Sequence, residues 1–109
     1  METRALQLPP TILFEKRDHI AIVTINRPDA MNALTKEMLL GIDHAFAEIE
    51  ADPELWVSIL TAAGDRAFCC GMDLKDAIPA LTSGDSPGYD DPTQRQFSDV
   101  FKPIIAAVN

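Results

Sequence analysis

The stretch AFCCGMDLKD, residues 67–76, carries the residue types of this chain that are best suited to chemistry. A strand that meets Gly71 can turn sharply, because glycine adopts backbone conformations that a Cβ atom forbids. Asp73 would then lie in the first turn of a following helix, where negative charge is favourable. Such a bend leaves backbone N–H groups unpaired. These donors predict half an oxyanion hole, which holds a carbonyl oxygen as it becomes negative. A purely structural glycine turn is the alternative.

The same stretch contains the only two cysteines of the chain, Cys69 and Cys70. A disulfide between neighbouring residues is strained, and two thiolates make at most half a zinc site. His19 and His44 are far away in sequence. We therefore predict no metal site and interpret the pair as small, semi-apolar residues of a tight buried turn.

Composition limits the class of protein. The 109 residues suffice for one domain or part of one, and 47% of them are apolar, enough for a core. The net charge of −8 argues against a nucleic-acid partner. No apolar run approaches the roughly 20 residues of a membrane span, and METRALQLPP does not resemble a secretory signal, so we expect a cytoplasmic protein.

Apolar periodicity and turn signals predict an alternation of strands and helices. The expected strands are residues 11–17, 19–26, 56–61 and 104–109, and the expected helices are residues 36–50, 73–81 and 93–101. Thr35 is the expected N-cap of the first helix, and residues 82–92 read as a loop. Because residues 19–26 are apolar on both faces, we expect that strand to be covered on both sides. We also expect the first helix to connect two parallel strands.

The predicted last strand is buried and stops at Asn109 without a cap or turn. We therefore expect residues 1–109 to be the N-terminal portion of a single domain that is truncated after Asn109.

Three ordered segments, IVTINRPDAMNAL (residues 22–34), AFCCGMDLK (67–75) and KPIIAAVN (102–109), carry a family resemblance. The chain resembles the N-terminal part of the enoyl-CoA hydratase/isomerase (crotonase) superfamily. The resemblance implies an α/β fold, the crotonase-like (ClpP/crotonase) spiral of repeated strand-strand-helix units. It also implies an acyl-CoA substrate, no tightly bound cofactor, coenzyme A only as part of the substrate, and a homo-oligomer, either trimer or hexamer, at full length.

The resemblance also implies roles for individual residues. The Met72 N–H would be the first oxyanion donor to the thioester carbonyl, and the Cys70 carbonyl would accept from the pantetheine amide. Arg27 would approach the CoA phosphates, with a solvated turn arginine as the alternative. The other implied substrate-binding and CoA-binding positions are Ala30, Asn32, Ala33, Leu34, Gly71, Asp73 and Leu74.

The expected activity is enoyl-CoA hydration, which also needs acid/base carboxylates. In the family these glutamates, and the second oxyanion donor, lie downstream of the residues present here. The carboxylates without a matching catalytic position are Glu37, Glu48, Glu50 and Glu54, and those expected to be solvated charges are Asp76 and Asp90.

Other activities stay open. Met72 is larger than the small residue of hydratases at this position, so an enoyl-CoA isomerase or acyl-CoA hydrolase is an alternative. A non-catalytic truncated remnant, which binds acyl-CoA weakly or pairs with a partner, is another.

Overall fold

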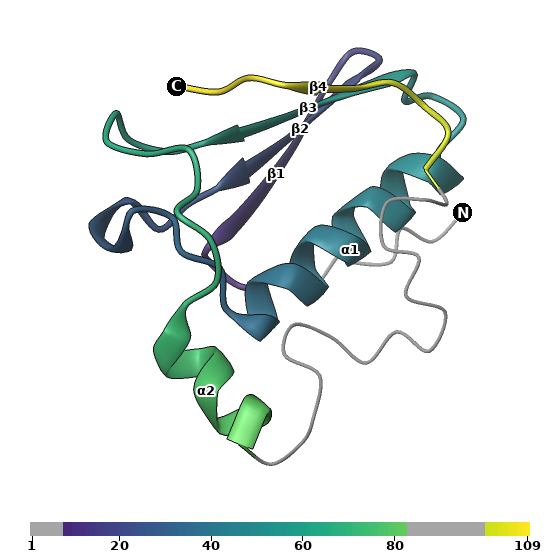
Figure 1. The fold of residues 1–109 in the computed structure, drawn as a ribbon. Helices are drawn as coiled ribbons and strands as arrows, with labels where there is room; N and C mark the ends of the chain where they lie inside the picture. Colours follow the sequence, from purple (N-terminus) through teal and green to yellow (C-terminus); the bar gives the residue numbers. More distant parts are fainter. Residues whose placement is uncertain (1–7, 83–99) are drawn as a thin grey trace.

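The computed structural model describes residues 8–82 and 100–109. Its centre is a four-stranded sheet in the order β1-β2-β3-β4 (Figure 1). The strands are β1 (Ile12–Arg17), β2 (Ile20–Ile25), β3 (Val57–Ala62) and β4 (Ile104–Ala106). β1 and β2 are antiparallel, whereas β3 is parallel to both β2 and β4. The helices are η1 (Pro28–Ala30), α1 (Lys36–Ala51) and α2 (Leu74–Thr82).

Helix α1 connects the parallel strands β2 and β3 and lies along one face of the sheet (Figure 1), which confirms the predicted crossover. Thr35 is its N-cap, and the Thr35 hydroxyl accepts a hydrogen bond from the Met38 N–H at 3.1 Å. The core forms where the apolar stripe of α1 meets the sheet. Its fully buried members include Ala21, Val23, Ile25, Met38, Ala45, Phe46 and Ile49.

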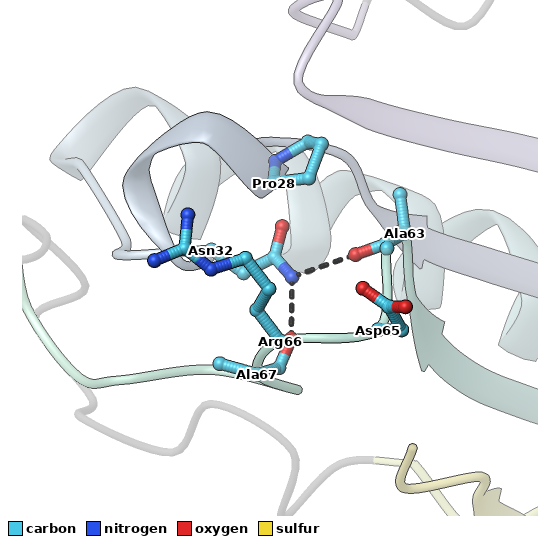
Figure 2. Close-up of a pocket in the computed structure, with 7 residues that line it drawn as sticks. Pro28, Asn32, Ala63, Asp65, Arg66 and Ala67 are labelled. Atoms are coloured by element: carbon cyan, nitrogen blue, oxygen red, sulfur yellow. Dashed lines mark hydrogen bonds between the residues drawn. The ribbon is translucent and has the colours of Figure 1, made fainter.

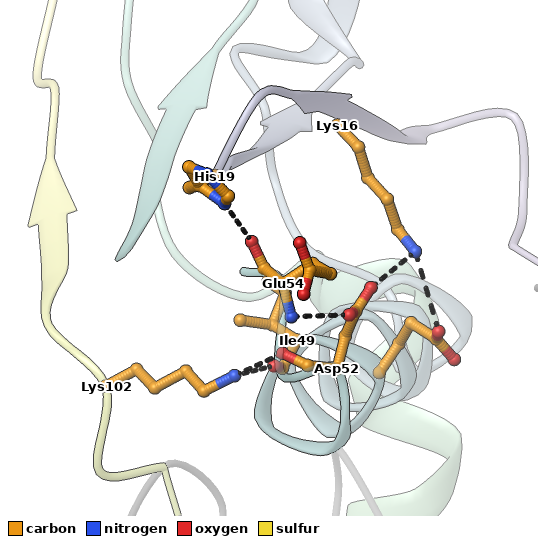
Figure 3. Close-up of polar contacts among 7 residues, drawn as sticks. Lys16, His19, Ile49, Asp52, Glu54 and Lys102 are labelled. Carbon is orange, nitrogen blue, oxygen red and sulfur yellow. Dashed lines mark hydrogen bonds and ion pairs between the residues drawn. The ribbon is translucent and has the colours of Figure 1, made fainter. Parts of the chain in front are cut away.

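The C-terminal end of α1 is held by side chains from distant parts of the chain (Figure 3). The Lys102 ammonium donates to the Ile49 carbonyl at 2.7 Å and to the Asp52 carbonyl at 2.6 Å. The Asp52 carboxylate accepts from Lys16 at 3.0 Å and from the Glu54 N–H at 2.9 Å. Lys102 thus adds a charged donor to two carbonyls at the C-terminal end of α1, where negative partial charge gathers, and ties the segment before β4 to α1.

The expectation that the second strand is covered on both faces is wrong for the part of the chain that the structure describes. Ala21, Val23 and Ile25 of β2 are buried under α1. The alternate residues are not: Ile20 is 36% exposed and Ile22 is half-buried. The physical reason is that α1 covers one face, and no described helix lies along the other.

Three further expectations need correction. Trp56 precedes β3 instead of lying in a buried strand; it is 61% exposed and stacks on the His19 ring at a centroid distance of 3.7 Å.

β4 is a short edge strand, and Ile105 is 55% exposed, because β3 is its one described neighbour. Cys70 is exposed and Cys69 only half-buried, so the turn is not a buried one, although both thiols are free.

The prediction of a helix over residues 73–81 is confirmed with a shift of one residue, as α2. The predicted loop 82–92 and helix 93–101 lie almost wholly outside the described residues. Of the helix, the structure describes Val100 and Phe101, and neither is helical.

Candidate functional site

The bend between β3 and α2 is made by a glycine. Gly71 has a φ of +106°, a backbone conformation that residues with a Cβ atom rarely adopt. A Cβ atom built on Gly71 would meet no heavy atom within 4 Å. The position therefore needs glycine for its backbone conformation and not for lack of space.

The residue after the bend pairs with a loop that is far away in the sequence. Leu34 and Met72 form an isolated parallel bridge. The Leu34 N–H donates to the Gly71 carbonyl, and the Asp73 N–H donates to the Leu34 carbonyl, both at 2.8 Å. Because successive peptide groups of an extended segment alternate in direction, the N–H of Met72 points away from Leu34. It donates to no acceptor among residues 8–82 and 100–109.

The carboxylate of Asp73, the residue after Met72, is bound on both of its oxygens. Asp73 directly precedes α2, and its Oδ1 accepts from the Lys75 N–H at 2.9 Å, as an N-cap does. Its Oδ2 accepts from Arg27 Nη1 at 2.7 Å. The hydrogen bond from Arg27 is the main reason that the pKa of Asp73 is lowered, and partial burial of the carboxyl opposes this effect. The N–H of Met72, which has no acceptor in the described part of the chain, thus lies one residue before an ionised carboxylate that accepts two hydrogen bonds.

The loop around η1 is held from inside by Asn32, whose side chain is buried with 1% exposure. Its amide nitrogen donates to the Ala63 carbonyl at 3.0 Å and the Ala67 carbonyl at 2.8 Å (Figure 2), and its oxygen accepts from the Arg27 N–H at 2.8 Å. Asn32 has a φ of +58°, a conformation that asparagine tolerates better than most residues. Asn32 thus joins the η1 loop to the turn that follows β3.

The same two segments enclose a small pocket of about 60 Å³ (Figure 2). Its lining residues are Pro28, Asn32, Ala63, Gly64, Asp65, Arg66 and Ala67. Ligand pockets have volumes of about 300–1,000 Å³. This pocket is therefore too small to hold a coenzyme by itself, although it lies at the edge of the candidate site.

The structure brings some of the predicted site residues together and separates others. Arg27, Leu34, Gly71, Met72 and Asp73 form one connected set. The side chain of Asn32 faces the protein interior, and Ala33 is also buried. Ala30 is half-buried, with the Cys70 thiol 3.9 Å from its carbonyl, and Leu74 is 65% exposed at the start of α2.

Arg27 has a different environment from either of the two that were expected. Its Nη1 donates to Asp73 and, at 3.1 Å, to the Ala33 carbonyl, and the side chain is only 28% exposed. It is therefore not a solvated turn arginine, and the predicted phosphate contact stays a prediction. Arg66 is the exposed cation at this edge, with no ion-pair partner in the part of the chain that is described. Arg66 lies two positions after Gly64, within the bend that follows β3, and it was not singled out from the sequence.

Three of the carboxylates named from the sequence are engaged in structural contacts, Asp76 near the bend and Glu48 and Glu50 at the C-terminal end of α1. Asp76, expected to be a solvated charge, accepts from the Lys36 N–H at 2.7 Å and so caps α1, although it is exposed. Glu48 lies 3.7 Å from Lys16, and Glu50 accepts from the Phe101 N–H. Asp90 lies outside the described residues.

Together these features define an α/β protein with a strand-to-helix bend, where one backbone N–H, that of Met72, has no acceptor among residues 8–82 and 100–109. Residues 15–109 match the family model described as enoyl-CoA hydratase/isomerase, and the chain belongs to this family, the crotonase superfamily.

Named relatives and solved structures agree. The chain is 37% identical over 100 residues to (E)-benzylidenesuccinyl-CoA hydratase of Thauera aromatica, and 39% identical over 100 residues to short-chain-enoyl-CoA hydratase of Clostridium acetobutylicum. These matches cover 90% of this chain and 39% and 38% of the relatives. The crystal structure of enoyl-CoA hydratase from Mycobacterium tuberculosis H37Rv matches with a TM-score of 0.73 and 39% identity, over 93% of this chain and 38% of that one. The chain thus spans about two fifths of the length of these relatives.

Proposed function

We propose that this chain supplies the first oxyanion donor and one wall of the acyl-CoA site in an enoyl-CoA hydratase. The observation that carries the proposal is the Met72 N–H, which has no acceptor among the described residues. The Gly71 bend presents this donor, and the bridge to Leu34 fixes its direction. A donor that is oriented before the substrate arrives needs no reorganisation during the reaction.

The proposed reaction adds water across the Cα–Cβ double bond of a 2-enoyl thioester. As the water oxygen bonds to Cβ it gives up one proton to a base, and electrons of the double bond move onto the thioester oxygen. The enolate electrons then return to Cα, which takes up a proton, so that OH is added to Cβ and H to Cα. The Met72 N–H would donate to that oxygen when it carries most negative charge, in the enolate. One donor of this kind typically contributes about 2.7–4 kcal/mol of transition-state stabilisation.

Coenzyme A would enter as part of the substrate. The Cys70 carbonyl would accept from the pantetheine amide, beside Ala30 on the η1 loop. The exposed guanidinium of Arg66 is the better candidate for a phosphate contact, because Nη1 of Arg27 is already bound to the protein. The proposal includes assembly as a homo-oligomer, trimer or hexamer, and a cytoplasmic location. No described helix is both long and apolar enough to cross a membrane.

A second candidate function is acyl-CoA binding without turnover. It is favoured by one observation: near the bend, Asp73 and Asp76 are bound to protein groups, so neither is placed as a free acid or base.

The direct test is amide NMR of the complete protein labelled with ¹⁵N-methionine. The variant Met72→Leu assigns the Met72 signal by its loss. We expect a 2-enoyl-CoA thioester to shift this signal downfield, and a CoA thioether that lacks the carbonyl oxygen to leave it nearly unchanged. Equal shifts with both ligands would exclude a bond to the thioester oxygen.

The reaction is tested on the same preparations. Loss of the ultraviolet absorbance of the conjugated enoyl thioester, with formation of the 3-hydroxyacyl product, supports hydration. A double-bond shift or release of free CoA would assign the isomerase or hydrolase reaction instead. Binding without any product would favour the second candidate.

A further inference from the structure

We propose that the ion pair between Arg27 and Asp73 is a positioning device for the Met72 N–H. This inference rests on the proposed function, because it concerns how the proposed donor is oriented. Arg27 is therefore a positioning residue, which acts through the backbone at Met72 and touches no reacting atom.

The first argument is geometric. A single atom, Arg27 Nη1, donates to the Ala33 carbonyl at 3.1 Å and to Asp73 Oδ2 at 2.7 Å. Ala33 directly precedes Leu34, and Asp73 directly follows Met72. The guanidinium therefore joins both segments immediately beside the bridge that orients the donor.

The second argument is that the pair is the contact nearest to the bridge. Other contacts between these segments lie further along the chain: Asn32 donates to the Ala67 carbonyl, and Asp76 accepts from the Lys36 N–H. The bridge itself is isolated, with one residue on each side and two hydrogen bonds, and is not part of the four-stranded sheet.

Among the described residues, Arg27–Asp73 is the only ion pair between the η1 loop and the segment at the bend. A pair this short and partly buried, with side-chain exposures of 28% and 16%, is less screened by water than a surface pair.

The third argument is that both partners are themselves fixed. The backbone N–H of Arg27 donates to the buried side chain of Asn32. Asp73 divides its two oxygens, with Oδ1 bound to the first turn of α2 and Oδ2 bound to Arg27. Because each end is anchored, the ion pair links the η1 loop to the start of α2 and not merely one side chain to another. Removal of the pair is therefore expected to loosen the bend between them.

The functional consequence is a specific kinetic pattern. A misdirected donor weakens the bond to the enolate oxygen more than the bond to the ground-state carbonyl. We therefore expect Arg27→Ala to lower kcat by about 10- to 100-fold, since small misplacements near the chemistry have effects of this size. The KM for the enoyl thioester should change by less than about 3-fold, because uniform binding is retained.

The experiment compares Arg27→Ala, Asp73→Asn and the double variant in the complete protein. Asparagine is a good N-cap, so Asp73→Asn keeps an acceptor for α2 while it removes the charge. If the pair acts as a unit, the double variant should lose no more kcat than Arg27→Ala alone. Arg27→Lys, which keeps the charge, should recover part of the activity.

Lys16→Ala is the matched control. It removes the ion pairs of Lys16 with Asp52 and Glu48, at the opposite end of α1. That helix of 16 residues separates these pairs from the bend by about 24 Å. We expect its kcat to equal that of the unchanged protein. Equal loss of kcat in Lys16→Ala and Arg27→Ala, or additive losses in the double variant, would overturn the inference.

A ligand-free readout separates this inference from the proposed function. The ¹⁵N-methionine spectrum of Arg27→Ala should show a shifted Met72 amide, with Met38 of α1 unchanged. An unchanged Met72 amide would overturn the positioning role whether or not the protein is an enzyme. If the unchanged protein neither binds nor converts a thioester, the proposed function fails, and the ligand-free spectra still decide the positioning of the amide.

Discussion

Leu34 and Met72 lie opposite each other in an isolated parallel bridge, although 38 positions separate them in the sequence (72 minus 34). Leu34 uses its N–H and carbonyl to hold the peptides on either side of Met72. The N–H of Met72 itself donates a hydrogen bond to none of the described residues. This relationship connects the η1 loop, which carries the family motif, to the bend where the proposed chemistry begins.

Replacement of Gly71 by alanine should destabilise the protein without creating a clash. The residue has a φ of +106° and open space around its Cα, so strain is the main cost. We expect the free energy of unfolding to fall by about 1–2 kcal/mol or somewhat more, measured by urea titration. The thioester-dependent shift of the Met72 amide should also decrease.

Gly64→Ala is the control for strain, because Gly64 has a φ of +85° but belongs to the turn after β3 and not to the bend at Gly71. A Cβ there would also lie 3.0 Å from Pro28 Cβ, so its loss of stability should be at least as large. The Met72 shift with thioester should persist. Loss of the shift in Gly64→Ala as well would show that general destabilisation, and not the bend, controls the amide.

Loss of the Asn32 side chain should be strongly destabilising. Asn32→Ala leaves two carbonyls and one backbone N–H without their partners in the part described, at about 1–3 kcal/mol for each buried group that finds no water. Asn32→Gly loses the same bonds but accepts the φ of +58°. It should therefore be about 1 kcal/mol more stable than Asn32→Ala by chemical denaturation. The reverse order would contradict the assigned conformation.

Acid should weaken the fold through two aspartates. The pKa of Asp73 is lowered mainly by the hydrogen bond from Arg27, and that of Asp52 mainly by the Glu54 N–H and then by Lys16. A folded-state pKa below the ordinary value of 3.8 means that the unfolded chain takes up protons first as the pH falls. This stabilisation is thus complete well above pH 3.8 and is lost as the pH falls through the lowered pKa values.

Thermal melts between neutral pH and the acid range check this effect. Asp73→Asn and Asp52→Asn should each show a smaller decrease in Tm on acidification than the unchanged protein. A decrease of the same size in both variants would assign the acid sensitivity to other groups.

Lys102→Met should loosen the segment before β4. The substitution keeps an unbranched apolar stem but removes the ammonium that donates to the Ile49 and Asp52 carbonyls. We expect a loss of about 1–2 kcal/mol, because a cation at a helix C-terminus is favourable and charged hydrogen bonds are strong. Hydrogen exchange of the Ser58 amide, which donates to the Pro103 carbonyl, should become faster, while Val23 amide exchange should change less.

Features set by neighbouring residues could be predicted from the sequence. Thr35 and the apolar stripe behind it predicted α1 nearly to the residue, because capping and helical periodicity act within a few positions. Gly71 followed by Asp73 predicted a bend and a helix start for the same reason. The alternation of strands and helices also indicated the α/β class and the parallel crossover.

Features set by contacts across the chain needed the tertiary structure. The sequence left open whether Arg27 is solvated or binds phosphate, and it could not show the ion-pair partner, which lies 46 positions away. Asn32 looked like a wall of the coenzyme site, but its side chain is buried between the η1 loop and the turn after β3. Periodicity also could not show which face of β2 is covered. The sequence by itself therefore determined the local elements and the bend, because these depend on neighbouring residues. The fold alone decided which polar groups of the described segments are already bound, and that the Met72 N–H has no acceptor among them.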